Sequence, residues 1–252
     1  MHSKFLSIFF LVLLLSVNSI NAQETIVQEE NDYSSETVFG VNFNTNGGLL
    51  GGVMFRHSSE LARGRYLTLG AEMVYIKHPN EARYPNSVTG SVYVLGKKNY
   101  LFSLRPQIGY EFILFTKGKE DGIQVDAIFN AGPSIGFVKP YYIQFDDGTK
   151  IVNEPYDAKK HDPETLGAGI IGPGGFFKGF DNIRLVPGFH IKSGLSFEFG
   201  AFNSGVSGIE AGVLLEAFPK QIEILDVSSS YSTYNRWFFS SLYVNIYFGG
   251  RR

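Results

Sequence analysis

The chain has 252 residues, with 22 Lys and Arg against 24 Asp and Glu, so its formal net charge of -2 lacks the basic balance of a nucleic-acid-binding protein. It contains no cysteine, which excludes disulfides, thiolate metal sites and a cysteine nucleophile. Its 29 Gly, 23 Phe and 14 Tyr favour an all-β protein with many tight turns.

The first 22 residues have the pattern of a secretory signal peptide. A short basic start precedes an apolar run from Phe5 to Leu15, and Ile20-Asn21-Ala22 ends in a small residue. The run is shorter than the roughly 20 apolar residues of a membrane-spanning helix, so we expect cleavage after Ala22. Residues 23–36 are acidic and poor in large apolar side chains, and we expect a flexible periplasmic segment there.

Residues 37–252 are predicted to form eight strands, because apolar and polar side chains alternate with a period of two. The pattern is clearest from Phe189 to Ala201, where one face is apolar and the other carries His, Lys, Glu, Ser and Gly. Such a pairing of faces is typical of a barrel wall with lipid outside and a polar lumen inside. The expected strands cover about 37–44, 49–57, 65–76, 100–115, 123–138, 189–201, 207–218 and 236–249.

The predicted connections separate by length, except for the brief first extracellular turn, Thr45-Asn46-Gly47-Gly48. Those at 58–64, 116–122 and 202–206 are short, and those at about 77–99, 139–186 and 219–235 are long. Outer-membrane barrels have short periplasmic turns and longer extracellular loops. The sequence therefore predicts an eight-stranded antiparallel transmembrane β-barrel of the outer-membrane type, located in the cell outer membrane and in contact with its lipids. A soluble sandwich is the alternative fold, and it accounts less well for charges on the inner face.

Nine ionisable side chains are predicted to face the lumen. An eight-stranded barrel has room inside only for side chains, so these groups should form a polar plug of ion pairs and hydrogen bonds. Their acids outnumber their bases, which implies waters, protonated carboxyls or misassigned positions, because unpaired buried charge is costly. A narrow channel along the acids is an alternative. The nine residues are Arg56, Glu72, Arg105, Glu111, Asp126, Lys192, Glu198, Glu210 and Glu216.

Three features together resemble the small PorT-like outer-membrane barrels: a signal peptide ending at Ala22-Gln23, about eight alternating strands with Gly and Tyr in the lumen, and a final strand ending in Tyr247-Phe248. The resemblance spans nearly the whole mature chain and is architectural. It implies a scaffold or accessory role in a cell-envelope protein complex, in type IX protein secretion or in outer-membrane protein assembly. It also implies insertion by the barrel-assembly machinery, although Gly249-Gly250-Arg251-Arg252 follow the aromatic residue.

An alternative is a lipid A-modifying barrel enzyme, because His57 and Ser58 place a possible base beside a possible nucleophile. The stretch from Phe55 to Glu60, which contains both residues, distantly resembles the His/Ser stretch of the lipid A 3-O-deacylases. Neighbouring strand residues point to opposite faces, however, and the predicted topology places this pair at the periplasmic rim. We therefore assign no catalytic residue and expect a protein that is not an enzyme.

The longest loop contains an expected protruding hairpin from Tyr141 to Val152 and many aromatic side chains, which should pack on the barrel rim, the membrane interface or a partner protein. A glycine-rich run, Gly167 to Gly175, lacks the Lys and Ser/Thr of a phosphate-binding loop and is interpreted as a bend. Six loop side chains could together ligate a cation but lack the spacing of a calcium loop, so no metal and no cofactor is predicted: Asp146, Asp147, Asp157, His161, Asp162 and Glu164. The predicted partner-contact residues are Tyr141, Tyr142, Tyr156, Phe176, Phe177 and Phe180.

Overall fold

The computed structural model describes residues 33–116, 122–161, 169–199, 205–226 and 235–252. The predicted signal peptide and residues 23–32 of the predicted acidic segment lie outside these ranges, as do parts of the connections at 116–122, 202–206 and 219–235. No helix within the described ranges is long and apolar enough to cross a membrane.

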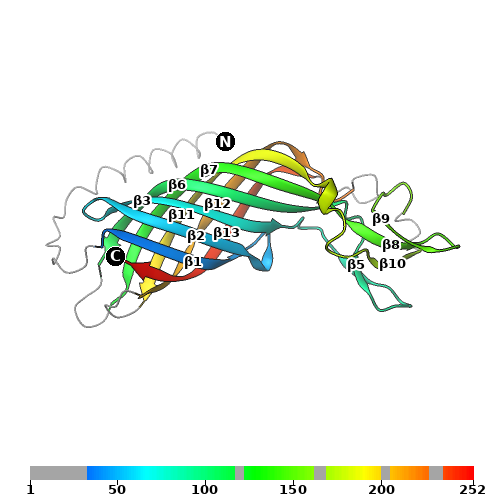
Figure 1. The fold of residues 1–252 in the computed structure, drawn as a ribbon, viewed down its shortest axis with the longest axis horizontal. Coiled ribbons are helices and arrows are strands. Elements are labelled where there is room, and N and C mark those ends of the chain that lie inside the picture. The colour runs from blue at the N-terminus through cyan, green and yellow to red at the C-terminus, as the bar shows by residue number, and fades with distance from the viewer. Residues whose placement is uncertain (1–32, 117–121, 162–168, 200–204, 227–234) are drawn as a thin grey trace, which may run out of the picture. The chain divides into compact units, whose positions relative to one another are not determined.

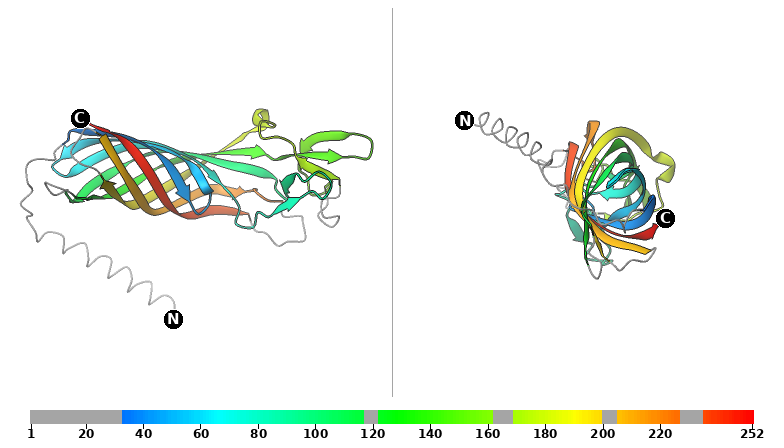
Figure 2. Two further views of the ribbon diagram at one scale, coloured as in Figure 1. Left: turned by 90° about the horizontal axis from the view of Figure 1, so that it is seen from below. Right: turned by 90° about the vertical axis from the view of Figure 1, so that its left-hand side faces the viewer.

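Eight long antiparallel strands of the described chain close into a barrel, which confirms the predicted fold class (Figures 1 and 2). Their order around the barrel is β1-β13-β12-β11-β7-β6-β3-β2, so the first strand pairs with the last. The strands are β1 (Ser35–Asn44), β2 (Gly48–Ala62), β3 (Arg65–Ile76), β6 (Asn99–Phe115), β7 (Gln124–Pro140), β11 (Arg184–Phe199), β12 (Gly205–Ile222) and β13 (Arg236–Arg251).

Several strands are longer than the alternation predicted. β2 continues to Ala62, and it meets β3 through a turn in which Gly64 has a φ of 70°. β11 begins at Arg184 because its ladder with β7 continues past Pro187, which pairs with Ile135. Pro187 has no N–H to donate to the ladder, so the sequence pattern indicates a strand that begins after it. The residues on both sides of Pro187 pair with β7, and the strand therefore begins earlier.

The predicted flexible segment at 23–36 is wrong for its last four residues. Tyr33 is buried and stacks on Tyr66 with ring centroids 4.5 Å apart, and Ser35 and Glu36 belong to β1. The backbone N–H groups of Ser34 and Ser35 both donate to the Arg252 carbonyl. The acidic composition predicts exposure to solvent, whereas Glu36 points into the barrel and is only 2% exposed.

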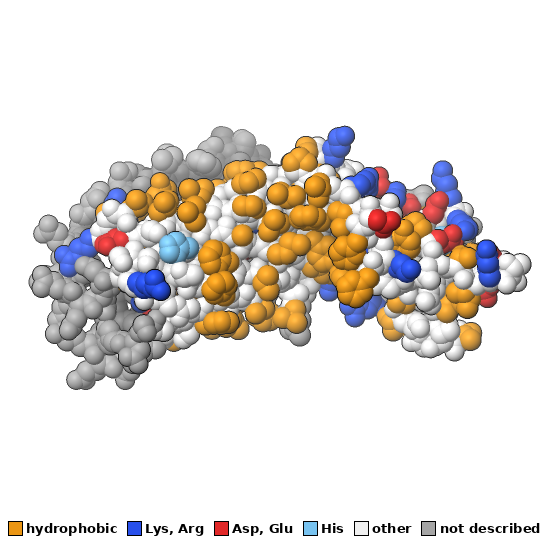
Figure 3. All heavy atoms as spheres, viewed as in Figure 1, with side chains coloured by type: hydrophobic (Ala, Val, Ile, Leu, Met, Phe, Trp, Pro, Cys, Tyr) orange, Lys and Arg blue, Asp and Glu red, His pale blue; other side chains and the backbone are white. Residues whose placement is uncertain are grey.

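The outer wall of the barrel is apolar. Alternate residues of every strand expose large side chains, and Figure 3 shows how they cover one face of the wall while charges gather towards its two ends. Phe39, Ile108, Phe189 and Leu242 are each about half exposed or more. Successive side chains of a strand point to opposite faces, so the polar residues that alternate with these apolar ones line the interior.

Two apolar layers close the interior near its ends. The end that carries the long connections, here called the loop end, contains a buried cluster of Val74, Ile76, Leu101, Val138, Phe218, Ile222, Ile224 and Phe239. The opposite end, where Ser35 and Arg251 lie, is called the terminal end, and it contains Val38, Met54, Val206 and Tyr247. The ionisable side chains of the interior lie below the loop-end cluster, and at the terminal end they extend past the smaller cluster, because Glu36 and Arg251 lie beyond Val38 and Tyr247 on β1 and β13.

The long connections at the loop end form a small unit with its own core. The hairpin β4 (Arg83–Pro85) and β5 (Val92–Val94) comes from one connection. Another connection forms a three-stranded sheet of β8 (Tyr142–Asp146), β9 (Ile151–Pro155) and β10 (Ile170–Pro173), in which β8 is the central strand. The predicted bend at Gly167 to Gly175 is therefore wrong for 170–173, which is a strand paired with β8. These elements are called the loop unit.

Candidate functional site

The structure places all nine predicted lumen residues inside the barrel, where each is at most 3% exposed. They come from six strands, β2, β3, β6, β7, β11 and β12, and on each strand they belong to the set of alternate residues that faces inward. Burial of this many charges requires that each find partners, since an isolated buried ion costs several kcal/mol.

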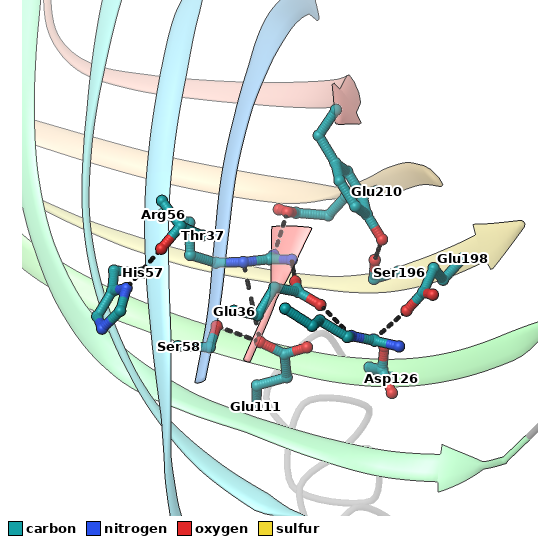
Figure 4. Close-up of polar contacts among 12 residues, drawn as sticks. Glu36, Thr37, Arg56, His57, Ser58, Glu111, Asp126, Ser196, Glu198 and Glu210 are labelled. Atoms are coloured by element: carbon teal, nitrogen blue, oxygen red, sulfur yellow. Dashed lines mark hydrogen bonds and ion pairs between the residues drawn. The ribbon is translucent and has the colours of Figure 1, made fainter. Parts of the chain in front are cut away.

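An alternating chain of acids and bases begins at the terminal end (Figure 4). The guanidinium of Arg251 contacts Glu198 and lies 2.8 Å from Glu36. Glu36 in turn lies 3.5 Å from Arg56, and the Arg56 Nη1 donates to Glu210 across 2.8 Å. Five strands, β1, β2, β11, β12 and β13, are thereby joined across the lumen.

The same chain continues towards the loop end. Glu210 also accepts from Lys192 Nζ at 2.7 Å, and Lys192 contacts Glu72 on its other side. Arg105 lies 3.8 Å from Glu72 and binds Glu216 through two of its nitrogens, at 2.7 and 3.1 Å. Each base in this chain therefore stands between two acids, which is the arrangement that best offsets desolvation of the charges.

Two further acids lie beside this chain. Glu111 accepts from the Ser58 hydroxyl at 2.8 Å and lies 3.8 Å from Arg56 Nε. Asp126 accepts from the Gln124 amide at 2.9 Å, and among the described residues no cation lies within 4.0 Å of it. The interior therefore has more carboxyls than bases, with the surplus near the terminal end.

Four residues that contact the charges of the interior are not in the predicted set of nine: Glu36, Arg251, Tyr243 and Tyr247. Glu36 and Arg251 extend the ion-pair chain, and both follow the period-two pattern when β1 and β13 are continued outwards. Tyr247 and Tyr243 supply aromatic faces to Arg56 and Lys192, with the cations 5.3 and 4.3 Å from the ring centroids. The inward parity of the final strand was a signal for both tyrosines.

The structure separates His57 from Ser58 (Figure 4). The His57 ring is on the outer side of β2, where Nδ1 lies 2.8 Å from the Thr37 hydroxyl and Nε2 lies 3.2 Å from the Ser59 hydroxyl. Ser58 is buried inside and donates to Glu111. The alternation of strand side chains keeps this base and this hydroxyl on opposite faces, so the pair cannot act together.

The predicted partner-contact aromatics divide into two groups. Tyr141 and Tyr156 are each 3% exposed and form the core of the loop unit with Tyr93, Ile143 and Ile170, so the prediction that they offer contact surface is wrong. Tyr142 is half-buried. Phe176, Phe177 and Phe180 are exposed, Phe177 by 84%, and their three rings contact one another.

The exposed phenylalanines are held by a buried lysine. Lys139 Nζ donates to the carbonyls of Phe176 and Lys178, at 2.7 and 3.0 Å, and lies about 5 Å from the ring centroids of Phe176 and Phe180. This ammonium fixes the backbone that presents the aromatic surface.

The acids of the loop unit support turns rather than a metal centre. Asp146 and Asp147 accept backbone N–H groups of the β8–β9 turn, and Glu154 binds Lys160 and His161. No group of three metal-ligating side chains is found among the described residues. Asp162 and Glu164 lie outside them.

Comparisons with known proteins find structural likeness only. No protein-family model matches this chain, and no curated protein matches it. Among solved structures, Neisserial surface protein A is similar over 86% of this chain and 96% of its own, with 7% identity and a TM-score of 0.40. Ail of Yersinia pestis is similar over 88% of this chain and 100% of its own, with 9% identity and a TM-score of 0.38.

Proposed function

We propose that this protein is an integral barrel of the cell outer membrane that acts without catalysis, as a structural or accessory subunit of a cell-envelope protein complex. Protein secretion or outer-membrane protein assembly is the process that the PorT-like resemblance favours. The observation that carries the proposal is the combination of an apolar outer wall with an interior filled by paired charges.

The outer wall supports placement in a membrane. Apolar side chains such as Phe129, Ile191 and Ile246 are about half exposed around the barrel, a surface that lipid would cover and water would not. Each strand of the barrel is hydrogen-bonded to a neighbouring strand on both sides, so its backbone N–H and C=O groups have partners in a lipid environment.

The filled interior supports a scaffold role. The chain of ion pairs runs through the lumen from Arg251 at the terminal end to Glu216, next to the apolar cluster at the loop end. An eight-stranded barrel has an interior just wide enough for side chains, and the described side chains that fill it favour a scaffold over a channel. The surfaces that remain for function are the wall and the loop unit, and the latter presents the exposed aromatic group of Phe176, Phe177 and Phe180.

The test is recovery of the tagged protein from membranes in mild detergent, with quantitative mass spectrometry of the proteins that remain bound. We expect envelope proteins at abundance comparable to the barrel. Their loss on Phe177→Ser with Phe180→Ser would identify the aromatic group as the contact. The matched control is Val88→Ser, which changes an apolar residue that is 90% exposed in the β4–β5 hairpin. Recovery of the barrel alone would contradict the proposal.

A further inference from the structure

A polar cavity of about 590 Å³ lies on the outside of the barrel at the loop end. Its inner wall is formed by Tyr75 of β3 and Tyr100 of β6, which have the outward parity of their strands. The connection between these strands contributes Lys77, Glu81, Arg83 and Lys97, and the connection after β7 contributes Tyr141 and Pro173. The volume is in the range of natural small-molecule sites.

The cavity has an excess of positive charge. Lys97 is buried and donates both to Glu81 and to the Tyr75 hydroxyl, each at 2.7 Å. Glu81 also accepts from the backbone N–H of His78, so the cavity's acid is already engaged. Among the described residues no carboxylate lies within 4.0 Å of the Lys77 ammonium or the Arg83 guanidinium.

The neighbouring charges act on Lys97 in a consistent way. Burial lowers the pKa of Lys97, Glu81 opposes that change, and both Lys77 and Arg83 lower the pKa further. The three cations therefore repel one another across a shared space with one acid between them. A bound anion would relieve this repulsion by lying between Lys77 and Arg83.

The cavity borders directly on the apolar wall. The rings of Tyr75 and Phe102 are 5.1 Å apart, and those of Tyr75 and Tyr100 are 6.0 Å apart, which makes an aromatic band beside the cavity. Further along the same strands, Met73 and Ile108 are exposed by 38% and 54%. Aromatic bands of this kind mark the level at which lipid tails end and headgroups begin.

We propose that this cavity binds a phosphate group carried by a lipid of the outer leaflet. The Lys77 ammonium and the Arg83 guanidinium donate to the phosphate oxygens, while the acyl chains of the same lipid lie on the wall below. The pair of Lys97 and Glu81 holds the cavity open and keeps the connection against Tyr75. A soluble acidic peptide would use the same charges, but the adjoining apolar wall favours a lipid. The inference rests on the membrane placement proposed above.

The test is a native mass spectrometry titration of the full chain in non-ionic detergent micelles. Phosphatidic acid is the probe, and phosphatidylcholine with the same acyl chains is the comparison lipid. The variant Lys77→Gln with Arg83→Gln removes the two donors. The variant Lys150→Gln with Lys159→Gln removes the same charge from exposed positions of the loop unit and serves as the control.

We expect the wild type to bind phosphatidic acid more tightly than phosphatidylcholine. Loss of two charge-assisted contacts should weaken phosphatidic acid binding by roughly tenfold or more in the cavity variant and leave the control unchanged. Equal loss in both variants, or no loss in the cavity variant, would overturn the proposal. Binding of inorganic phosphate as tight as that of the lipid would overturn the assignment to a lipid.

Two separate measurements keep this result distinct from failure of the fold or of the proposed function. A heat-dependent shift in electrophoretic mobility shows that each variant forms a closed barrel. Resistance to carbonate extraction from membranes tests the membrane placement itself. A barrel that is folded and inserted but does not prefer phosphatidic acid contradicts the cavity proposal alone.

Discussion

Arg251 and Glu36 join the last strand of the barrel to the first: the Arg251 Nε donates to Glu36 Oε2 across 2.8 Å, and the two residues are direct partners in the β1–β13 ladder. The Arg251 guanidinium also lies 3.8 Å from the centroid of the Tyr33 ring. The residues after the final aromatic thus close the barrel at its terminal end, beside the start of the first strand.

Replacement of Arg251 by Gln should destabilise the barrel, because Glu36 and Glu198 would lose a charged partner while remaining buried. Arg251 is 17% exposed, so we expect a loss of about 2 kcal/mol, below that of a fully buried pair. Urea unfolding in lipid vesicles, followed by the fluorescence of the single Trp237, measures it. Arg252→Gln, at the exposed neighbour, should leave the midpoint unchanged.

Lys192 lies between Glu72 and Glu210, and its replacement by Met should cost about 3 to 5 kcal/mol by leaving two buried acids without their shared cation. Adding Glu72→Gln should restore part of the loss. A double-mutant cycle on the free energy of unfolding checks this, with an expected coupling of about 2 kcal/mol. Additive effects would show that the contact contributes little.

Gly208 leaves room for the Tyr247 ring, whose hydroxyl lies 2.7 Å from that of Ser196. A Cβ at position 208 would lie 2.6 Å from Tyr247 Cζ, so Gly208→Ala should destabilise the barrel by about 1 to 3 kcal/mol. Gly205→Ala is the control, because a Cβ there meets nothing within 4 Å. A comparison of the two urea midpoints decides the point, and equal midpoints would contradict the steric role.

Hydrogen bonds from the Thr149 hydroxyl and from the backbone N–H groups of Thr149 and Lys150 lower the pKa of Asp147 to about 2. Because the folded pKa is depressed, the support that Asp147 gives the β8–β9 turn is full above its unfolded pKa and is lost as pH falls through about 2. Carboxyl NMR titration should show this, and Thr149→Val should raise the pKa. An unchanged titration in that variant would refute the assignment.

Replacing His57 and Ser58 together by Ala should leave lipid A unchanged, since the His57 ring lies outside the barrel near Thr37 and Ser59 while Ser58 lies inside near Glu111. Mass spectrometry of lipid A from cells with and without the variant tests this. The substitution also removes the His57 ring beside the Ser59 hydroxyl, so the same experiment tests whether His57 and Ser59 act together as base and nucleophile. A change in acylation would revive the enzyme alternative.

The lumen residues could be placed from sequence because alternation assigns each side chain to a face without knowledge of its neighbours. That is why Arg105 and Glu210 were placed inside although they lie far apart in the chain. Tyr33 and Glu36 lie in a segment whose acidic composition is typical of a tail, so their burial cannot be predicted from it. The strand at Ile170 depends on its partner β8, which lies in a different part of the loop. The burial of Tyr141 and Tyr156 cannot be predicted from sequence, because it depends on their packing against other parts of the loop unit.

The sequence by itself determined the all-β class, the number of barrel strands and the face of each strand, since these depend on local periodicity. Only the tertiary structure decided which charges pair, because a carboxyl on β12 meets a guanidinium on β2 solely through closure of the barrel. It also decided that one connection supplies Lys77, Arg83 and Lys97 to a single cavity beside Tyr75. Contacts between distant segments depend on register and closure, which no local pattern encodes.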